Sequence, residues 1–286
     1  MPLILGGLVP HPPLLVPEVG GARLQDVDRT RLALEGLCRE VTEAAPERLV
    51  MVTPHGPYQR GRMSCLAAPH LNGNLARFGC PEVSLRWPVD QALCRRLVEA
   101  AERRGVPVDL LEGVELDHAL MVPLVYLARA GFQAPMVALS ISGLPRSSHL
   151  ALGQAVAETL APHPAVLLAS GDLSHRLLED GPYGFDPRGP VFDREVVRHL
   201  DPLDRDALAS LPEDLVEGAG VCGMKPLMVL LGALPPQSRG KVLSYEGPFG
   251  VGYAVARLTP PHDAEAEPLR LARAAVETWV REQREL

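Results

Sequence analysis

Residues 165–175 read AVLLASGDLSH, and this stretch decides the fold. The apolar run at 165–170 has the length of a strand that is buried on both faces of a sheet. Two polar residues, Asp172 and His175, follow the run at once. Ligands of open α/β sheets bind beyond the carboxyl ends of the strands. The stretch therefore predicts a largely parallel sheet and also the edge of that sheet that carries the chemistry.

Similar apolar runs alternate with helical patterns along the chain. Further buried strands are expected at residues 3–9, 48–53 and 136–142, with a closing pair at 241–245 and 252–258. Helices are expected at 24–41, 90–104, 120–130, 147–160, 192–200, 204–210 and 223–234, whereas the Gly- and Pro-rich region 54–88 holds at most short strands such as 83–87. This alternation predicts an α/β fold, a single domain with a mixed, mostly parallel central sheet covered by helices on both faces. We expect the domain to span residues 1–259, followed by a linker and a C-terminal helix within 260–286.

The composition is that of an ordinary globular protein and excludes several classes. With 28 basic and 35 acidic residues the formal charge is −7, which argues against nucleic acid as the main ligand. Five prolines interrupt the apolar N-terminus by residue 17, so it is neither a signal peptide nor a membrane span. The five cysteines include no CxxC pair, which favours a reducing cytoplasm.

Histidines follow three of the predicted strands. His11 lies among prolines after 3–9, His55 follows 48–53, and His175 follows 165–170, while His118 opens the helix before 136–142. A single histidine at a turn is as often a cap, so the prediction rests on the set. Because neutral imidazole is the commonest metal ligand, the set predicts a metal site. The remaining histidines are expected to have solvated roles: His70, His149, His163, His199 and His262.

The anionic ligand stays open when the residues are considered alone. A metal that activates a substrate commonly takes two histidines and one anionic group. The candidate carboxylates are Asp117, Asp172 and Glu246. Cys222 lies in GVCG at a predicted helix start, where the helix dipole would favour a thiolate, although it also fits a small buried hydrophobe.

Five motifs occur in the same order as in a known family. They are VPHPPLLVPEVG, TPHG, LDHALMVPLVYL, SGDLSHRL with the following EDGPYGFDPRGPVFD, and SYEGPFGVGYAVA. Together they resemble the class III extradiol ring-cleavage dioxygenases of the LigB type, and most of all the Memo-like branch of that superfamily. The resemblance covers about residues 1–258. It implies a single α/β domain with a metal at the strand ends.

The resemblance also implies roles for individual residues. In the dioxygenases two His and one Glu hold Fe(II) and leave positions for a catechol and O₂. By motif, His11 and His55 match the metal-binding histidines, His175 the acid/base histidine and His118 a further active-site histidine. Cys222 occupies the position of the family's Glu, as in Memo-like proteins, and is the expected third ligand; Glu246 is the alternative if its strand reaches the same pocket. Asp172 is expected among the catalytic residues, and Asp117 and Glu246 as additional pocket residues.

Three functions are compatible with these residues. The first is a non-haem, metal-dependent oxidoreductase of extradiol dioxygenase type that acts with O₂ on a catechol-like or other small aromatic substrate. The second is a Memo-like metal- or ligand-binding protein that works with a radical-SAM-associated partner enzyme without ring cleavage, because a thiolate is softer than a carboxylate and is itself oxidised. The third is a zinc hydrolase. Fe(II) is the expected cofactor, with Zn and Cu as alternatives; we expect no nucleic-acid or membrane partner, and a homo-oligomer stays open.

Overall fold

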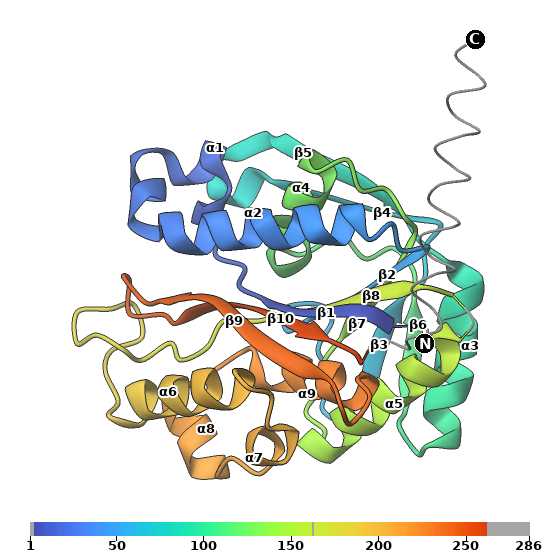
Figure 1. Cartoon of the computed structure of the whole chain (residues 1–286). Helices are drawn as coiled ribbons and strands as arrows, with labels where there is room; N and C mark the ends of the chain where they lie inside the picture. Colours follow the sequence, from blue (N-terminus) through green and yellow to red (C-terminus); the bar gives the residue numbers. More distant parts are fainter. Residues whose placement is uncertain (1–2, 162, 262–286) are drawn as a thin grey trace.

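The computed structural model describes residues 3–161 and 163–261, and one large sheet forms its centre (Figure 1). The strands of this sheet are β1 (Leu3–Val9), β2 (Arg48–Thr53), β3 (Met63–Leu66), β6 (Val108–Leu111), β7 (Met136–Ser140), β8 (Ala165–Ser170), β9 (Arg239–Glu246) and β10 (Tyr253–Thr259). They lie in the order β6-β3-β7-β2-β8-β1-β10-β9. The central strands β7, β2, β8 and β1 run parallel, while β3 joins β7, and β10 joins β1, in antiparallel fashion. The predicted mixed, mostly parallel sheet is confirmed.

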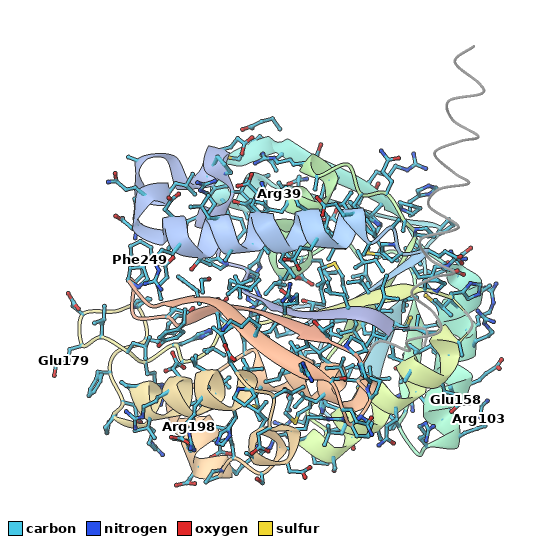
Figure 2. All side chains as sticks on the ribbon, viewed as in Figure 1. Arg39, Arg103, Glu158, Glu179, Arg198 and Phe249 are labelled. Carbon is cyan, nitrogen blue, oxygen red and sulfur yellow. The ribbon has the colours of Figure 1, made fainter. Side chains whose placement is uncertain are left out.

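Helices cover both faces of the sheet (Figure 1). α2 (Asp28–Glu43) and α4 (His118–Arg129) pack on one face, and α5 (Arg146–Leu160) and α9 (Met224–Ala233) on the other. α3 (Gln91–Arg103) packs against α5, and α6 (Arg188–Leu200), α7 (Arg205–Ala209) and α8 (Glu213–Ala219) form a group beside β9. Side chains fill the space between these layers, and charged pairs such as Arg103 and Glu158 lie outside (Figure 2). The layers are therefore those of the predicted α/β domain.

The region 54–88 contains more strand than its sequence predicted. Besides β3, it forms a separate two-stranded sheet of β4 (His70–Leu75) and β5 (Cys80–Pro88). β4 buries Leu71, Gly73 and Leu75 and exposes the residues between them. This alternation is the strand signal, but a glycine in the buried set conceals it from a count of apolar residues.

Other element boundaries also differ from the prediction. The helix expected from Leu24 is instead a 3-10 segment, Gly21–Val27, followed by the α-helix α2. Strand β6 and helix α8 were not predicted. α1 (Pro17–Gly20) and the 3-10 turns Pro13–Leu15 and Ala76–Phe78 complete the elements. The predicted C-terminal helix lies outside the described residues. No helix in the described ranges is long and apolar enough to cross a membrane.

The parallel strands bring distant parts of the sequence to one edge of the sheet. Val9 at the end of β1 pairs with Ser170 at the end of β8, and Thr53 at the end of β2 pairs with Ser140 at the end of β7. β2 and β8 are themselves neighbours. Residues that follow these strands therefore start from the same edge, which is where we expect ligands in such sheets.

Candidate metal centre

Ligand atoms from three strand ends gather around the His11 imidazole. His11 Nε2 lies 3.1 Å from His55 Nε2 and 3.7 Å from Cys222 Sγ. The potential ligands form two groups, and within each group the ligand atoms lie within 4.8 Å of one another. One group is His11, His55 and His118, and the other is His11, Asp172 and Cys222. Neither group contains both His55 and Cys222. His11 Nε2 is therefore the centre of the cluster, with the two groups on either side of it.

A chain of contacts that begins at a proline in α4 orients the His11 ring. Pro123 has no N–H, so the carbonyl of Ala119, four residues earlier, loses its helical donor. The Ser170 hydroxyl donates to this carbonyl at 2.6 Å, and Ser170 Oγ lies 3.0 Å from His11 Nδ1. Since the Ser170 proton is already engaged, Nδ1–H must donate to Ser170 Oγ. This assigns the tautomer in which His11 Nε2 offers a lone pair to the cluster.

His55 and His118 are positioned by the start of α4. Asp117 caps this helix by accepting from the amides of Ala119 and Leu120, and the Thr53 hydroxyl donates to the same carboxylate at 2.9 Å. Thr53 Oγ1 in turn accepts from the His55 amide at 3.1 Å. The His55 and His118 rings stack with their centroids 4.6 Å apart. Asp117 thus orients the loop that carries His55 and is not itself in either ligand group.

Close contact between two loops brings Cys222 to Asp172. The Gly223 amide donates to the Asp172 carbonyl at 2.9 Å, and the Asp172 amide donates to Cys222 Sγ at 3.2 Å. Against the expectation that a helix dipole favours a thiolate here, burial, and next the Asp172 carboxylate, raise the pKa of Cys222 well above its usual value. A bound cation would reverse this, since a coordinated thiol is deprotonated.

Burial keeps the histidines of the cluster neutral. It lowers the pKa of His11 well below its usual value and lowers those of His118 and His175 to about 4; the neighbouring His55 adds to each shift. Burial also lowers the pKa of His55. The same burial raises the pKa of Asp172 to about 7, although the hydrogen bond from the His11 amide acts to lower it. Neutral imidazoles present lone pairs, so the electrostatics of the site suit a cation.

His175 lies beside the cluster with one ring nitrogen unpaired. Its Nε2 is buried without a hydrogen-bond partner among the described residues. Its ring stacks on Tyr183, with centroids 4.9 Å apart, and the Tyr183 side chain is exposed. A buried, unpaired nitrogen of this kind is available to a ligand.

Two of the expectations about individual residues do not match the structure. Glu246 belongs to neither ligand group, because its carboxylate accepts from the Thr30 amide at 2.8 Å near the start of α2. His149 was expected to be solvated but is fully buried, and its Nε2 accepts from the Ser142 amide. By contrast, His11, His55, His118, Asp172 and Cys222 lie together around the His11 ring, and His175 lies near His55.

The residues that orient the ligands were not predicted from the sequence. Ser170 and Thr53 each end a buried strand, and nothing else in the sequence distinguishes them. A hydroxyl at the carboxyl end of an otherwise apolar strand was the available signal. Pro123 inside an apolar helix was a second signal, since it frees a carbonyl that needs another donor.

Ser170→Ala is expected to weaken metal binding without removing a ligand. The substitution leaves His11 Nδ1–H without its acceptor, so the ring is free to turn or to change tautomer. Loss of such an outer partner costs about 10–100-fold in metal affinity, and we expect a change of that size in an anaerobic chelator competition. Ser64→Ala is the matched control, because the Ser64 hydroxyl is equally buried but has no hydrogen-bond partner among the described residues. Equal affinities of the two variants would contradict this role of Ser170.

Comparison with known proteins agrees with this geometry. The sequence matches the family described as "Catalytic LigB subunit of aromatic ring-opening dioxygenase" over residues 6–256. Protein CA_C1420 of Clostridium acetobutylicum is 34% identical over 263 residues, which are 88% of this chain and 56% of that protein. The chain therefore spans about half the length of the curated relative that it matches.

A solved structure shows the same fold. The crystal structure of the uncharacterized protein JW3007 from Escherichia coli K12 aligns with 90% of this chain and 99% of its own, with a TM-score of 0.62 and 20% identity. At this identity the likeness concerns the fold alone. The family match extends over most of the described residues and includes every strand end of the cluster. The chain thus belongs to the LigB family.

Proposed function

We propose that this protein is a metal-dependent oxidoreductase of extradiol dioxygenase type that acts with O₂ on a catechol-like or other small aromatic substrate. In this proposal His11, His55 and Cys222 hold Fe(II), and His175 is the acid/base residue, with His118 and Asp172 beside it. The observation that carries the proposal is the convergence of ligand atoms on His11 Nε2 at the carboxyl ends of the parallel strands. Membership of the LigB family supports it.

Each donor pair that contains His11 fits a shared metal ion, whereas His55 and Cys222 belong to no common group within 4.8 Å and would have to move closer together to bind the same ion. Two ligand atoms held about 2.1–2.3 Å from one ion at an angle of about 90–110° lie roughly 3.0–3.6 Å apart. The separations of His11 Nε2 from His55 Nε2 and from Cys222 Sγ, 3.1 and 3.7 Å, are close to this range. Two neutral imidazoles and one thiolate suit Fe(II), Zn²⁺ and copper alike, so iron is proposed on the strength of the family.

The chain's own residues supply the proton chemistry. Bound Fe(II) would supply the passage of electrons from the aromatic ring to O₂. His175 Nε2 is buried and unpaired among the described residues, so a substrate hydroxyl is the partner that it lacks. Its pKa of about 4 makes it neutral at pH 7, so its lone pair is available for a hydrogen bond from that hydroxyl. An anionic substrate beside it would raise the pKa of the imidazole, because a nearby negative charge favours the protonated form.

Cys222 favours a second function. A thiolate ligand is softer than a carboxylate and is open to oxidation during O₂ chemistry. In the alternative proposal the protein is a Memo-like metal- or ligand-binding protein that works with a radical-SAM-associated partner enzyme and does not cleave rings. This chain spans 56% of the length of the related Clostridium protein. The additional length of that protein is compatible with a further functional part there.

Two substitutions at Cys222 separate these functions. Cys222→Ala is expected to lower Fe(II) affinity at least about 10-fold. Loss of a residue that only hydrogen-bonds to a metal ligand already lowers metal affinity by about 10-fold or more. Cys222→Glu is expected to restore binding and to sustain O₂ uptake with catechols at or above the wild-type rate, because it supplies an anionic oxygen ligand. Cys38→Ala, at a buried thiol of α2, is the control. Iron retained by Cys222→Glu without O₂ uptake on any of a panel of catechols would favour the second function.

A further inference from the structure

A buried carboxylate lies outside the metal centre and has no cation beside it among the described residues. Asp193 of α6 is 1% exposed and accepts hydrogen bonds from the Ser174 amide and the Tyr245 hydroxyl, each at 2.7 Å. Burial raises the pKa of Asp193 to about 6, although both hydrogen bonds act to lower it. The side chain is therefore mostly ionised at pH 7 in surroundings that disfavour charge. An apolar side chain would pack α6 without this cost, so the packing of α6 does not account for Asp193.

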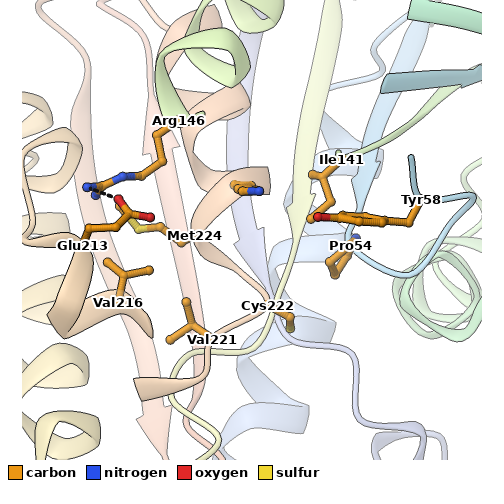
Figure 3. A pocket seen from close by; sticks show the side chains of 10 residues that line it. Pro54, Tyr58, Ile141, Arg146, Glu213, Val216, Val221, Cys222 and Met224 are labelled. Carbon is orange, nitrogen blue, oxygen red and sulfur yellow. Dashed lines mark ion pairs between the residues drawn. The ribbon is translucent and has the colours of Figure 1, made fainter. Parts of the chain in front are cut away.

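Asp193 belongs neither to the metal centre nor to the pocket beside it. It is in neither of the two ligand groups. Cys222 lines the pocket, with Pro54 and Tyr58 on one side and Arg146 on the opposite side (Figure 3). Asp193 is not one of the described residues that line this pocket. Its effect on these sites therefore has to pass through the residues that it binds.

Asp193 binds the loop that carries Asp172 and His175. Each of the four backbone amides of residues 172–175 donates to an acceptor elsewhere in the chain. Three of these acceptors are Cys222 Sγ and the carbonyls of Gly252 and Ala219. The acceptor of the Ser174 amide is the Asp193 carboxylate. The residue next to His175 is thus held by an ionised acceptor, and such hydrogen bonds are about twice as strong as those between neutral groups.

The start of β10 closes this contact off from water. The Gly252 carbonyl accepts from the Leu173 amide at 2.8 Å, and the Gly252 amide donates to the Ser174 carbonyl at 2.7 Å. A Cβ at Gly252 would overlap Asp193 Oδ2, so there is no room between them for a methyl group or a water molecule. The hydrogen bond to Ser174 therefore acts in surroundings of low dielectric constant, where it is stronger than in water. Movement of Asp193 is passed directly to the loop.

The direction of the His175 imidazole depends on this loop. The ring stacks on the exposed Tyr183 ring, with centroids 4.9 Å apart, and its Nε2 has no hydrogen-bond partner among the described residues. Its backbone therefore sets where Nε2 points. An acid/base residue has to come within hydrogen-bonding distance of its substrate, and catalytic groups have to be held within about 0.5 Å of their working positions.

We propose that Asp193 is the positioning residue of His175: through the Ser174 amide it holds the loop after β8 so that the His175 imidazole faces the substrate. The inference rests on the proposed function, in which His175 is the acid/base residue. It assigns Asp193 no contact with the metal or with the substrate. Removal of the carboxylate is therefore expected to impair His175 and to leave iron binding close to that of wild type.

Chemical modification of histidines tests this positioning without any substrate. Diethyl pyrocarbonate reacts with accessible neutral imidazoles, and peptide mass spectrometry gives its rate at each histidine of the full-length, metal-free protein at pH 7. Asp193→Ala is expected to raise the rate at His175 at least about 10-fold, because loss of one hydrogen bond to a charged group increases the open population of the loop by that factor or more. Asp193→Asn is expected to react as wild type does, since its amide oxygen can accept from Ser174.

Two other histidines make the result specific to the loop. His70 is exposed and reports the reactivity of the reagent, whereas His149 is fully buried in α5 and reports opening of the whole domain. His149 is expected to stay protected in Asp193→Ala. Asp204→Ala is the matched control, because the exposed Asp204 carboxylate accepts from a backbone amide at 3.0 Å at the start of α7. Its removal is expected to leave the rate at His175 unchanged.

Three results would overturn the inference. They are an unchanged rate at His175 in Asp193→Ala, a rise at His175 that His149 shares equally, and an Asp193→Asn variant that reacts as fast as Asp193→Ala. If Asp193→Ala does not fold, as judged by circular dichroism, Asp193→Ser replaces it in the same comparison. A serine hydroxyl with water can pair with the Tyr245 hydroxyl but is too short to reach the Ser174 amide.

Oxygen uptake by the iron-loaded variants separates this inference from the proposed function. With any catechol that wild type turns over, Asp193→Ala is expected to lower kcat about 10-fold or more, since acid/base catalysis contributes about 10²–10⁴-fold. KM and iron content are expected to stay close to those of wild type. Loss of iron from the variant would show that Asp193 supports the metal ligands and would overturn the inference. If wild type turns over no catechol, the proposed function fails, whereas the modification rates still decide whether Asp193 positions His175.

Discussion

His11→Ala is expected to lower the affinity for Fe(II) by more than about 100-fold. Removal of a residue that only hydrogen-bonds to a metal ligand costs about 10–100-fold, and removal of a ligand itself costs more. His11 Nε2 is the one atom that both ligand groups share, so no alternative set of the described residues replaces it. Ser170 Oγ would also lose its contact with His11 Nδ1, whereas the hydrogen bond from the His11 amide to the Asp172 carboxylate is retained. Anaerobic chelator competition measures the affinity, and metal analysis after desalting measures the stoichiometry.

Two further variants give this experiment its controls. His70→Ala removes an exposed histidine of β4 and is expected to bind iron as wild type does. His118→Ala separates the proposed ligand set from the three-histidine group: with His11, His55 and Cys222 as ligands the variant retains iron, whereas a site of His11, His55 and His118 loses it. Full iron content in His11→Ala would contradict the proposed centre altogether.

Gly171→Ala is expected to destabilise the protein by about 1–3 kcal/mol or more and to weaken metal binding as well. A Cβ at Gly171 would lie 2.2 Å from Gly223 Cα, which is backbone and not a flexible side chain. The loops after β8 and before α9 must therefore separate. Their separation breaks the hydrogen bond from the Gly223 amide to Asp172 and moves Cys222 away from His11. Urea unfolding measures the first effect and chelator competition the second.

Gly36→Ala is the matched control for this substitution. Gly36 lies within α2, and a methyl group there would have the Arg39 guanidinium as its nearest neighbour, at 4.0 Å. Alanine there is expected to raise the free energy of unfolding by about 0.5–1 kcal/mol, since it favours the helix. Wild-type stability in Gly171→Ala would show that the two loops are not fixed by their backbone contact.

The fold could be predicted wherever a strand is buried on both faces. β8, β1 and β2 are short apolar runs bounded by Gly, Pro or polar residues, and their helices alternate with them. β4 was missed because its buried positions include Gly73, which fits against Leu116 and Met121 where a side chain would not. Such a fit depends on the tertiary structure and leaves no local trace in the sequence.

Which residues form the metal-site cluster could also be predicted, but the residues that orient them could not. The histidines at the strand ends follow from topology, because parallel strands end at one edge. The burial of Cys222 beside Asp172, which raises the pKa of its thiol, could not be predicted from its place at a helix start. The contacts from Pro123 through Ser170 to His11, and the pairing of Glu246 with α2, require knowledge of which elements face each other. The roles of the cluster residues remain predictions.

A thiolate and two imidazoles are proposed to bind one iron ion at the edge of the sheet. X-ray absorption at the iron edge, on anaerobically Fe(II)-loaded wild type, tests this most directly. We predict one sulfur neighbour at about 2.3 Å and at least two nitrogen neighbours at about 2.1 Å, with the sulfur absent in Cys222→Ala. A shell of nitrogen and oxygen alone in wild type would contradict the proposed centre and would move the metal to the three histidines.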